Sequence, residues 1–341
     1  MEGLRNAIYQ DWTKDIQEKG YLDWLVYTEC RSDNAYGGNP GTGELMAIEA
    51  NRQDGENKNV ERDWDWYLGQ VSKCNNIIFN IDRIKEADES MTEKEWKEWK
   101  SEAYCWRAWN LFQMSQIWGD IPLVNSIPPA ISADNIEDVY KDYYPPRTAR
   151  VEVYKQIVGE LEFAAENAPE TDPSNKHLFT KAFAHGMLAR IFAEETLRNW
   201  EQVAKHCEAI EKMNYELVDD YAQMWAYDET DAVRNTSESI FEVTFTRSSG
   251  NWVWMMCGFI ISSRVKPAGR VPRFSISTRS SYIAMLTKPD GESYNLCARA
   301  FRRHSLKALY GIVRDSTRSG CPSTNVPDIF RCLKRNAIPS S

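Results

Sequence analysis

Few residues in this sequence have the type and spacing that catalysis or metal binding needs. The four histidines, at positions 177, 185, 206 and 304, form no HExxH motif and no pair three or four residues apart, so none is expected to bind zinc. Asp63 and Asp65 lie two residues apart on an expected helix and point in different directions, which gives no support to a paired acid–base role. A Walker motif is also missing from the sequence. We therefore predict a protein that is not an enzyme and uses no cofactor.

Aromatic residues within polar stretches are more informative. Tyr36 lies in the segment SDNAYGG, and Trp64 follows the charged stretch NRQDGENKNVERD. A flat ring beside amides and carboxylates suits a sugar, because the ring covers the C–H face while the polar groups bond the hydroxyls. The competing interpretation is that such rings begin the next helix and pack inward, and we favour it for Trp66 and Tyr67. The residues predicted to border a ligand surface are Asp33, Asn34, Tyr36 and Trp64.

The elements that must position these residues are mostly helices. Residues 151–168 carry apolar side chains on one stripe with a helical period and charged side chains on the opposite side. A second helix is expected from Thr92 to residue 118, because Thr92 and Glu95 have the spacing of a capping box. From residue 103 onward this helix is apolar on nearly every face. It must therefore be surrounded by other helices.

Two more helices are expected at residues 181–195 and, after Asn199 as N-cap, up to residue 213. The first carries a row of small residues that would let a neighbouring helix approach closely. Short connections between helices predict antiparallel hairpins stacked as in tetratricopeptide repeats. Residues 239–246 alternate as a strand would. The predicted fold class is mainly α, with tetratricopeptide-like helical hairpins, irregular loops and minor β structure.

Composition excludes several classes of protein. The chain has 341 residues, a formal charge of −9 and 42% hydrophobic residues, which indicates a globular protein that does not bind nucleic acid. Its longest apolar run, at 253–261, is half the length that a membrane-spanning helix requires. The eight cysteines form no CxxC pair, so no disulfide framework is expected. Cys74, Cys105 and Cys207 are predicted to be small buried residues.

Residue usage changes abruptly near position 255. All 13 tryptophans precede residue 255, and residues 256–341 carry fifteen basic against four acidic side chains, a formal charge of +11. A basic nucleic-acid tail is one explanation. We favour the other, a terminus translated out of frame, and expect this tail to be disordered or poorly packed. The predicted domains are therefore 1–255, a helical domain, and 256–341, an atypical basic tail.

Several motifs of the first 255 residues resemble the SusD/RagB-like outer-membrane nutrient-binding lipoproteins. The most specific is EAYCWRAWNLF at 102–112 followed by GDIPL at 119–123. Trp64 with VSKCNNII at 71–78, PRT at 146–148, TKAFAHGMLAR at 180–190 and ESIFEV at 238–243 follow in the family's order. The resemblance extends from about residue 5 to about residue 255.

The resemblance implies a helical protein at the cell surface, anchored in the outer membrane. It would capture oligosaccharides or polysaccharides without catalysis and pass them to a SusC-type TonB-dependent transporter. The N-terminus has no signal peptide or lipid-anchor cysteine, and the tail matches no part of the family that we recognise. Taken literally, the chain would stay in the cytosol. Because the resemblance implies an outer-membrane protein, we expect the chain to be truncated at both ends.

The alternative function is a tetratricopeptide-like scaffold that binds other proteins. A helical glycosidase would need two carboxylates facing one cleft.

Overall fold

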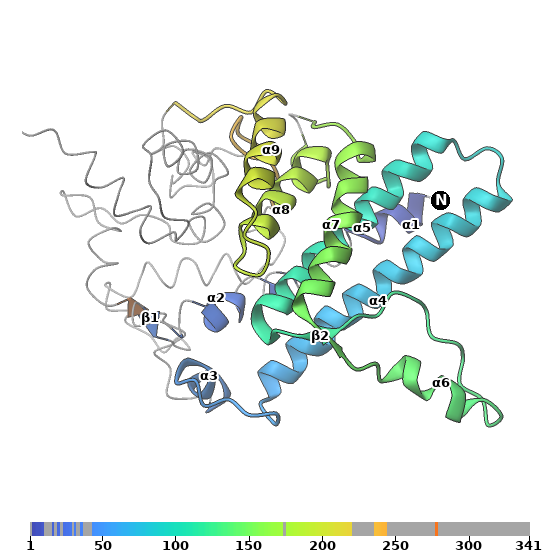
Figure 1. Ribbon diagram of the computed structural model, residues 1–341, viewed down its shortest axis with the longest axis vertical. Coiled ribbons are helices and arrows are strands. Elements are labelled where there is room, and N and C mark those ends of the chain that lie inside the picture. The colour runs from blue at the N-terminus through green and yellow to red at the C-terminus, as the bar shows by residue number, and fades with distance from the viewer. Residues whose placement is uncertain are drawn as a thin grey trace, which may run out of the picture.

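Helices make up most of the described part of the chain (Figure 1). The structure is a computed structural model that describes residues 2–9, 16, 19–20, 23–28, 31, 35–36, 43–172, 175–219, 235–243 and 277–278. Its helices are α1 (Glu2–Asn6), α2 (Asp23–Thr28), α3 (Gly43–Glu49), α4 (Lys58–Ala87), α5 (Glu93–Trp118), α6 (Ile136–Tyr143), α7 (Arg150–Asn167), α8 (Lys181–Ala193) and α9 (Trp200–Glu211). No helix in these ranges is both long and apolar enough to cross a membrane.

Helices α4 and α5 form a long hairpin that starts and turns at well-capped ends. The Asn57 side chain accepts hydrogen bonds from the backbone N–H groups of Asn59 and Val60 and so caps α4. At α5 the Glu95 N–H donates to the Thr92 hydroxyl, and the Thr92 N–H donates back to the Glu95 carboxylate at 2.9 Å. The predicted capping box is thereby confirmed. Both caps satisfy backbone donors that a helix start leaves without partners.

Thr92→Ala is expected to lower the free energy of unfolding by about 1 kcal/mol, because it removes the oxygen that caps the first turn of α5. Thr92→Ser keeps that oxygen and should stay within a few tenths of a kcal/mol of the parent. Urea unfolding followed by tryptophan fluorescence measures both changes. Equal losses for the two variants would show that the hydroxyl does not stabilise the helix start.

Helix α5 is the centre of the bundle, as its sequence predicted. Between Ser101 and Ser115 every side chain is buried except Tyr104, which is partly exposed. Helix α4 packs on one side of α5 and α7 on the other, and α8 also reaches it. Trp106 and Trp109 stack at 5.1 Å in this core. Cys74 and Cys105, also in the core, are buried, as is Cys207 on α9, which confirms their prediction as small packed residues.

The remaining helices continue the stack of hairpins. Helix α8 packs on α7, and α9 packs on α8. The small residue Ala189 of α8 is fully buried against Val203 and Cys207 of α9, which confirms the expected close approach. Asn199 caps α9 by accepting from the Gln202 N–H. The predicted class of tetratricopeptide-like helical hairpins is therefore confirmed.

β structure in the described residues consists of two short antiparallel pairs. Strand β1 (Ala35–Tyr36) pairs with β4 (Ser277–Thr278), and β2 (Ile121–Pro122) pairs with β3 (Arg147–Thr148). The rest of the tail after residue 255, with the prediction that it is poorly packed, lies outside the described residues.

The strand predicted at 239–246 is wrong for its described part, residues 239–243, which are irregular. Its alternating pattern arises because the segment docks on the helices. Phe241 stacks on Phe179 at 5.1 Å and meets Phe183 edge-on. The Glu242 N–H donates to the carbonyl of Lys176 at 2.8 Å. The apolar residues Ile240, Phe241 and Val243 thus pack against the bundle, and the described part of this segment is not a strand.

Candidate ligand-binding surface

Trp64 lies in the second turn of α4, within the helix and not in the loop before it. Its ring meets Trp118, the last residue of α5, edge to face at 5.2 Å and 88°. Both tryptophans are partly exposed. Their neighbours Trp66 and Tyr67 are buried in the core, with exposed fractions of 7% and 0%, which confirms that these two rings pack inward. Helix α4 therefore turns Trp64 toward the edge of the bundle and its neighbours toward the core.

A polar cluster connects the same end of α4 with α2. The Tyr27 hydroxyl donates to the Asp63 carboxylate at 2.7 Å. The guanidinium of Arg62 donates to Asp63 at 2.9 Å and also pairs with Asp23. Burial, followed by the nearby Asp63 charge, raises the pKa of the Tyr27 hydroxyl. Tyr27 therefore stays a neutral donor that anchors α2 on α4, and its ring lies 6.2 Å from Trp118.

These groups suit binding better than acid–base chemistry. The Asp63 side chain is fully buried and already accepts from two donors. By contrast, the Arg62 side chain is 36% exposed. Trp64 and Trp118 add flat, partly exposed rings. Partly exposed flat rings of this kind can hold a polyhydroxylated ligand by covering its C–H face.

The other predicted site residues are described less completely. The backbone of Tyr36 lies in β1, where it pairs with Ser277 of β4. Asp33 and Asn34 lie outside the described residues. The grouping of these three residues with Trp64 therefore stays a prediction.

Sequence reasoning missed the partners of Trp64 and a second group of exposed rings. Trp118 was assigned only to the end of a helix, because a helical pattern does not show which residue of another helix it will meet. Three further tyrosines, Tyr140, Tyr143 and Tyr144, are 57%, 40% and 70% exposed. The run YKDYYPP was the available signal, since the two prolines place these rings at the end of a helix.

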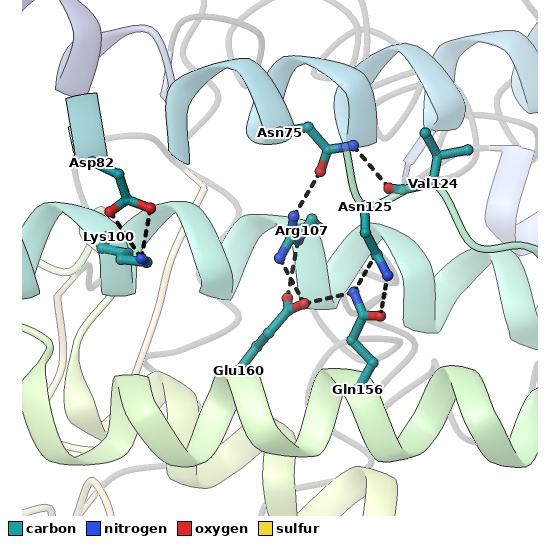
Figure 2. Close-up of polar contacts among 8 residues, drawn as sticks. All are labelled: Asn75, Asp82, Lys100, Arg107, Val124, Asn125, Gln156 and Glu160. Atoms are coloured by element: carbon teal, nitrogen blue, oxygen red, sulfur yellow. Dashed lines mark hydrogen bonds and ion pairs between the residues drawn. The ribbon is translucent and has the colours of Figure 1, made fainter. Parts of the chain in front are cut away.

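A buried polar network lies between α4, α5 and α7 (Figure 2). Arg107 of α5 donates from two nitrogens to both carboxylate oxygens of Glu160 on α7, at 2.7 and 3.1 Å. A third nitrogen donates to the Asn75 side-chain oxygen on α4 at 2.7 Å. Arg107 and Glu160 are each only 8% exposed at their side chains. One guanidinium thus links three helices in a fork geometry that only arginine provides.

The same network fixes the segment that leaves β2. The Asn75 amide donates to the carbonyl of Val124 at 2.8 Å, and Asn125 donates to Gln156 at 2.7 Å (Figure 2). Gln156 in turn donates to Glu160 at 2.8 Å. The backbone at 124–125 is thereby tied to both α4 and α7. Figure 2 also shows an ion pair between Lys100 of α5 and Asp82 of α4. The Lys100 Nζ lies 2.8 Å from each carboxylate oxygen of Asp82.

The described histidines include one pair that the sequence spacing could not show. The Nδ1 atoms of His185 on α8 and His206 on α9 lie 2.9 Å apart and share a hydrogen bond. His206 is 2% exposed and stacks on Phe192 at 5.8 Å. Burial, together with the neighbouring His185 and Lys205, lowers the pKa of His206 to about 4. Within the described ranges no group of three or more His, Cys, Asp and Glu side chains is placed to hold a metal ion.

Comparison with solved structures shows the same fold. The structure superimposes on a SusD superfamily protein of Bacteroides thetaiotaomicron with a TM-score of 0.68 and 15% identity, over 98% of this chain and 78% of that one. Surface glycan-binding protein A of Bacteroides fluxus superimposes with a TM-score of 0.62 and 20% identity, over 84% of this chain and 61% of that one. A SusD-like protein of Bacteroides fragilis superimposes with a TM-score of 0.52 and 23% identity, over 69% of this chain and 43% of that one.

The chain spans 43% and 61% of the B. fragilis and B. fluxus proteins. No functionally curated protein shows significant sequence similarity to it. A family model, in contrast, matches residues 9–193, more than half of the chain, and its description is "Starch-binding associating with outer membrane". The hairpins α4–α5 and α7–α8, with the motifs that they carry, lie inside this match, and the chain belongs to the SusD-like family.

Proposed function

We propose that this chain is the non-catalytic glycan-binding component of an outer-membrane uptake system. The observation that carries the proposal is the family match over residues 9–193 with its starch-binding description. The partly exposed Trp64–Trp118 pair supports it, because flat rings cover the C–H face of a sugar. Buried, already bonded Asp63 supports a role in binding and not in hydrolysis.

The proposal extends to location and partner. The family description places such proteins at the outer membrane, so we propose the cell surface as the site of action. A SusC-type TonB-dependent transporter is the proposed recipient of the bound oligosaccharide or polysaccharide. The alternative, a scaffold that binds only proteins, would leave the Trp64 surface without a sugar ligand.

Trp64→Ala is expected to weaken glycan binding about tenfold, or 1.4 kcal/mol, because it removes one ring of the pair and leaves Trp118 without its edge contact. Retardation in native gels that contain starch or laminarin measures the effect. Phe79→Ala is the matched control, since Phe79 is an exposed ring on the same helix, 54% exposed, and has no part in the proposed surface.

Three outcomes separate the alternatives. Loss of retardation in Trp64→Ala alone supports the proposed surface. Unchanged retardation in both variants, with helix content intact, would exclude Trp64 from it. Shortened oligosaccharides after incubation with the parent protein would contradict the non-catalytic assignment.

A further inference from the structure

An arm of the chain projects from the bundle between β2 and β3. We define the tyrosine arm as residues 126–146, which include α6. Figure 1 shows α6 at the end of an excursion that leads away from the other helices. The β2–β3 pairing brings the two ends of the arm together, with Pro122 opposite Arg147. The hydrogen bond from the Asn75 amide to the Val124 carbonyl holds one end against α4. The arm therefore carries α6 away from the bundle on a fixed base.

One side of α6 is already occupied by contacts within the arm. Val139 is 8% exposed, and the Tyr143 hydroxyl donates to the carbonyl of Pro129 at 2.7 Å. The side chain of Asn135, just before the helix, donates to the carbonyl of Ala130 at 3.0 Å. These hydrogen bonds tie α6 to the segment before it. They fix which of its residues face outward.

The outward side of α6 carries two tyrosine rings and a carboxylate. Glu137, Tyr140 and Tyr144 lie at i, i+3 and i+7 and share one face. The ring centroids of Tyr140 and Tyr144 are 4.9 Å apart, their planes are inclined by 31°, and the residues remain 57% and 70% exposed. Neither hydroxyl bonds another residue of the described ranges. The pair therefore presents flat apolar surface beside polar oxygens that are open to a ligand.

This combination suits a sugar better than a protein groove. A ring covers the C–H face of a sugar, while phenol and carboxylate oxygens accept hydrogen bonds from its hydroxyls. A groove on another protein would instead take up an apolar helix face. On α6 the buried Val139 is not available for such a face. The family match, with its starch-binding description, favours the same class of ligand.

Charge narrows the class of sugar. The arm carries four acidic residues against the single basic Lys141, which gives a formal charge of −3. The four acidic side chains, all exposed, are Asp134, Glu137, Asp138 and Asp142. Like charges repel, so a polysaccharide that bears carboxylate or sulfate groups would be disfavoured at the arm. A neutral polysaccharide would meet no such repulsion.

We propose that the Tyr140–Tyr144 pair, with Glu137 beside it, is a second contact site for a neutral polysaccharide, separate from the Trp64 surface. The inference rests on the proposed glycan-binding function and extends it to long chains. Trp64 and Trp118 lie on helices of the bundle, whereas the tyrosine pair lies on the arm (Figure 1). A polymer that contacts one surface meets the second at a high effective concentration, which raises the overall affinity.

Retention of the full chain in native gels that contain starch or laminarin tests the proposal. The double variant Tyr140→Ala/Tyr144→Ala should weaken retention about fivefold, because it removes both rings. Tyr140→Phe/Tyr144→Phe keeps the rings and should lose less than about twofold. Ile136→Ser is the matched control. Ile136 is 50% exposed on the same helix and offers no ring, so retention should not change. All these positions are exposed, and the urea midpoint should stay that of the parent.

The outcomes distinguish this site from the Trp64 surface and from a protein-docking face. Equal retention of parent and Tyr140→Ala/Tyr144→Ala would overturn the proposal. An equal loss in Ile136→Ser would do the same, because it would show an apolar docking face. Retention in gels of anionic polygalacturonate that depends on the two tyrosines would contradict the neutral class.

The Trp64→Ala variant in the same gels separates the two proposals. If Trp64→Ala loses retention and Tyr140→Ala/Tyr144→Ala keeps it, the proposed function stands and the second site is wrong. If the parent itself is not retained by starch or laminarin, both proposals fail.

Discussion

Replacing Arg107 by methionine is expected to lower the free energy of unfolding by about 3–5 kcal/mol. The change removes the guanidinium that pairs with Glu160 and bonds Asn75. Glu160 would then be a buried carboxylate with only the Gln156 amide as a remaining donor, and an uncompensated buried charge is expensive. Urea unfolding followed by the fluorescence of the core tryptophans measures the loss.

Companion variants separate the pair from simple loss of packing. Arg107→Met combined with Glu160→Met removes both charges and should recover at least half of the lost stability, because no buried charge is left without a partner. Lys155→Ala is the matched control on α7. It breaks the Lys155–Glu152 pair, whose side chains are 65% and 53% exposed, and should cost less than about 0.5 kcal/mol. A loss below about 1 kcal/mol for Arg107→Met would show that water enters the site and solvates Glu160.

Acid is expected to destabilise the α8–α9 hairpin through the histidine pair. His206 has a folded-state pKa of about 4 against 6.5 in the unfolded chain. Between these values the unfolded state binds more protons, so stability is complete above pH 6.5 and decreases as the pH falls toward 4. The pKa of His185 is lowered as well, by burial and then by Lys205 and Lys181. We expect a loss on the order of 2 kcal/mol by pH 4.

The comparison that isolates this effect uses His206→Phe, which keeps a ring against Phe192 and removes the titrating group. Burial raises the pKa of Glu102 and Glu194, which adds a pH dependence of opposite sign. The quantity to measure is therefore the difference in unfolding free energy between parent and variant from pH 7 to pH 4. A difference that does not change over this range would mean that His206 titrates with the same pKa in the folded and unfolded states. NMR titration of the His206 ring would report its folded-state pKa directly.

The helices were predictable because their signals are local. The capping box at Thr92, the N-cap at Asn199 and the apolar stripe of α7 each depend on residues within a few turns. The nearly continuous apolar surface of α5 also predicted that it would lie at the centre. The strand prediction at 239–243 was wrong because its signal was not local. Apolar residues among polar ones show only that some side chains pack inward, and here Ile240, Phe241 and Val243 pack on helices.

The candidate site was predictable only in part. Trp64 was identified from its polar surroundings, but its contact with Trp118 joins residues 54 positions apart. The Tyr27–Asp63 and Arg62–Asp23 contacts likewise join α2 to α4 across a long stretch of sequence. The histidine pair is 21 residues apart and becomes adjacent only when α8 packs on α9. No spacing rule within one helix identifies such partners.

The sequence by itself determined the helical class, the family and the identity of the residues that must be buried, because periodicity, caps and motifs are encoded locally. Tertiary structure alone decided which polar groups meet. Arg107 finds Glu160 and Asn75 only because α4, α5 and α7 pack side by side. It also decided which rings remain exposed: Tyr67 is buried between helices, whereas Tyr140 and Tyr144 lie on an arm that the bundle does not cover. Exposure depends on the neighbours that folding supplies, and a single chain segment does not specify them.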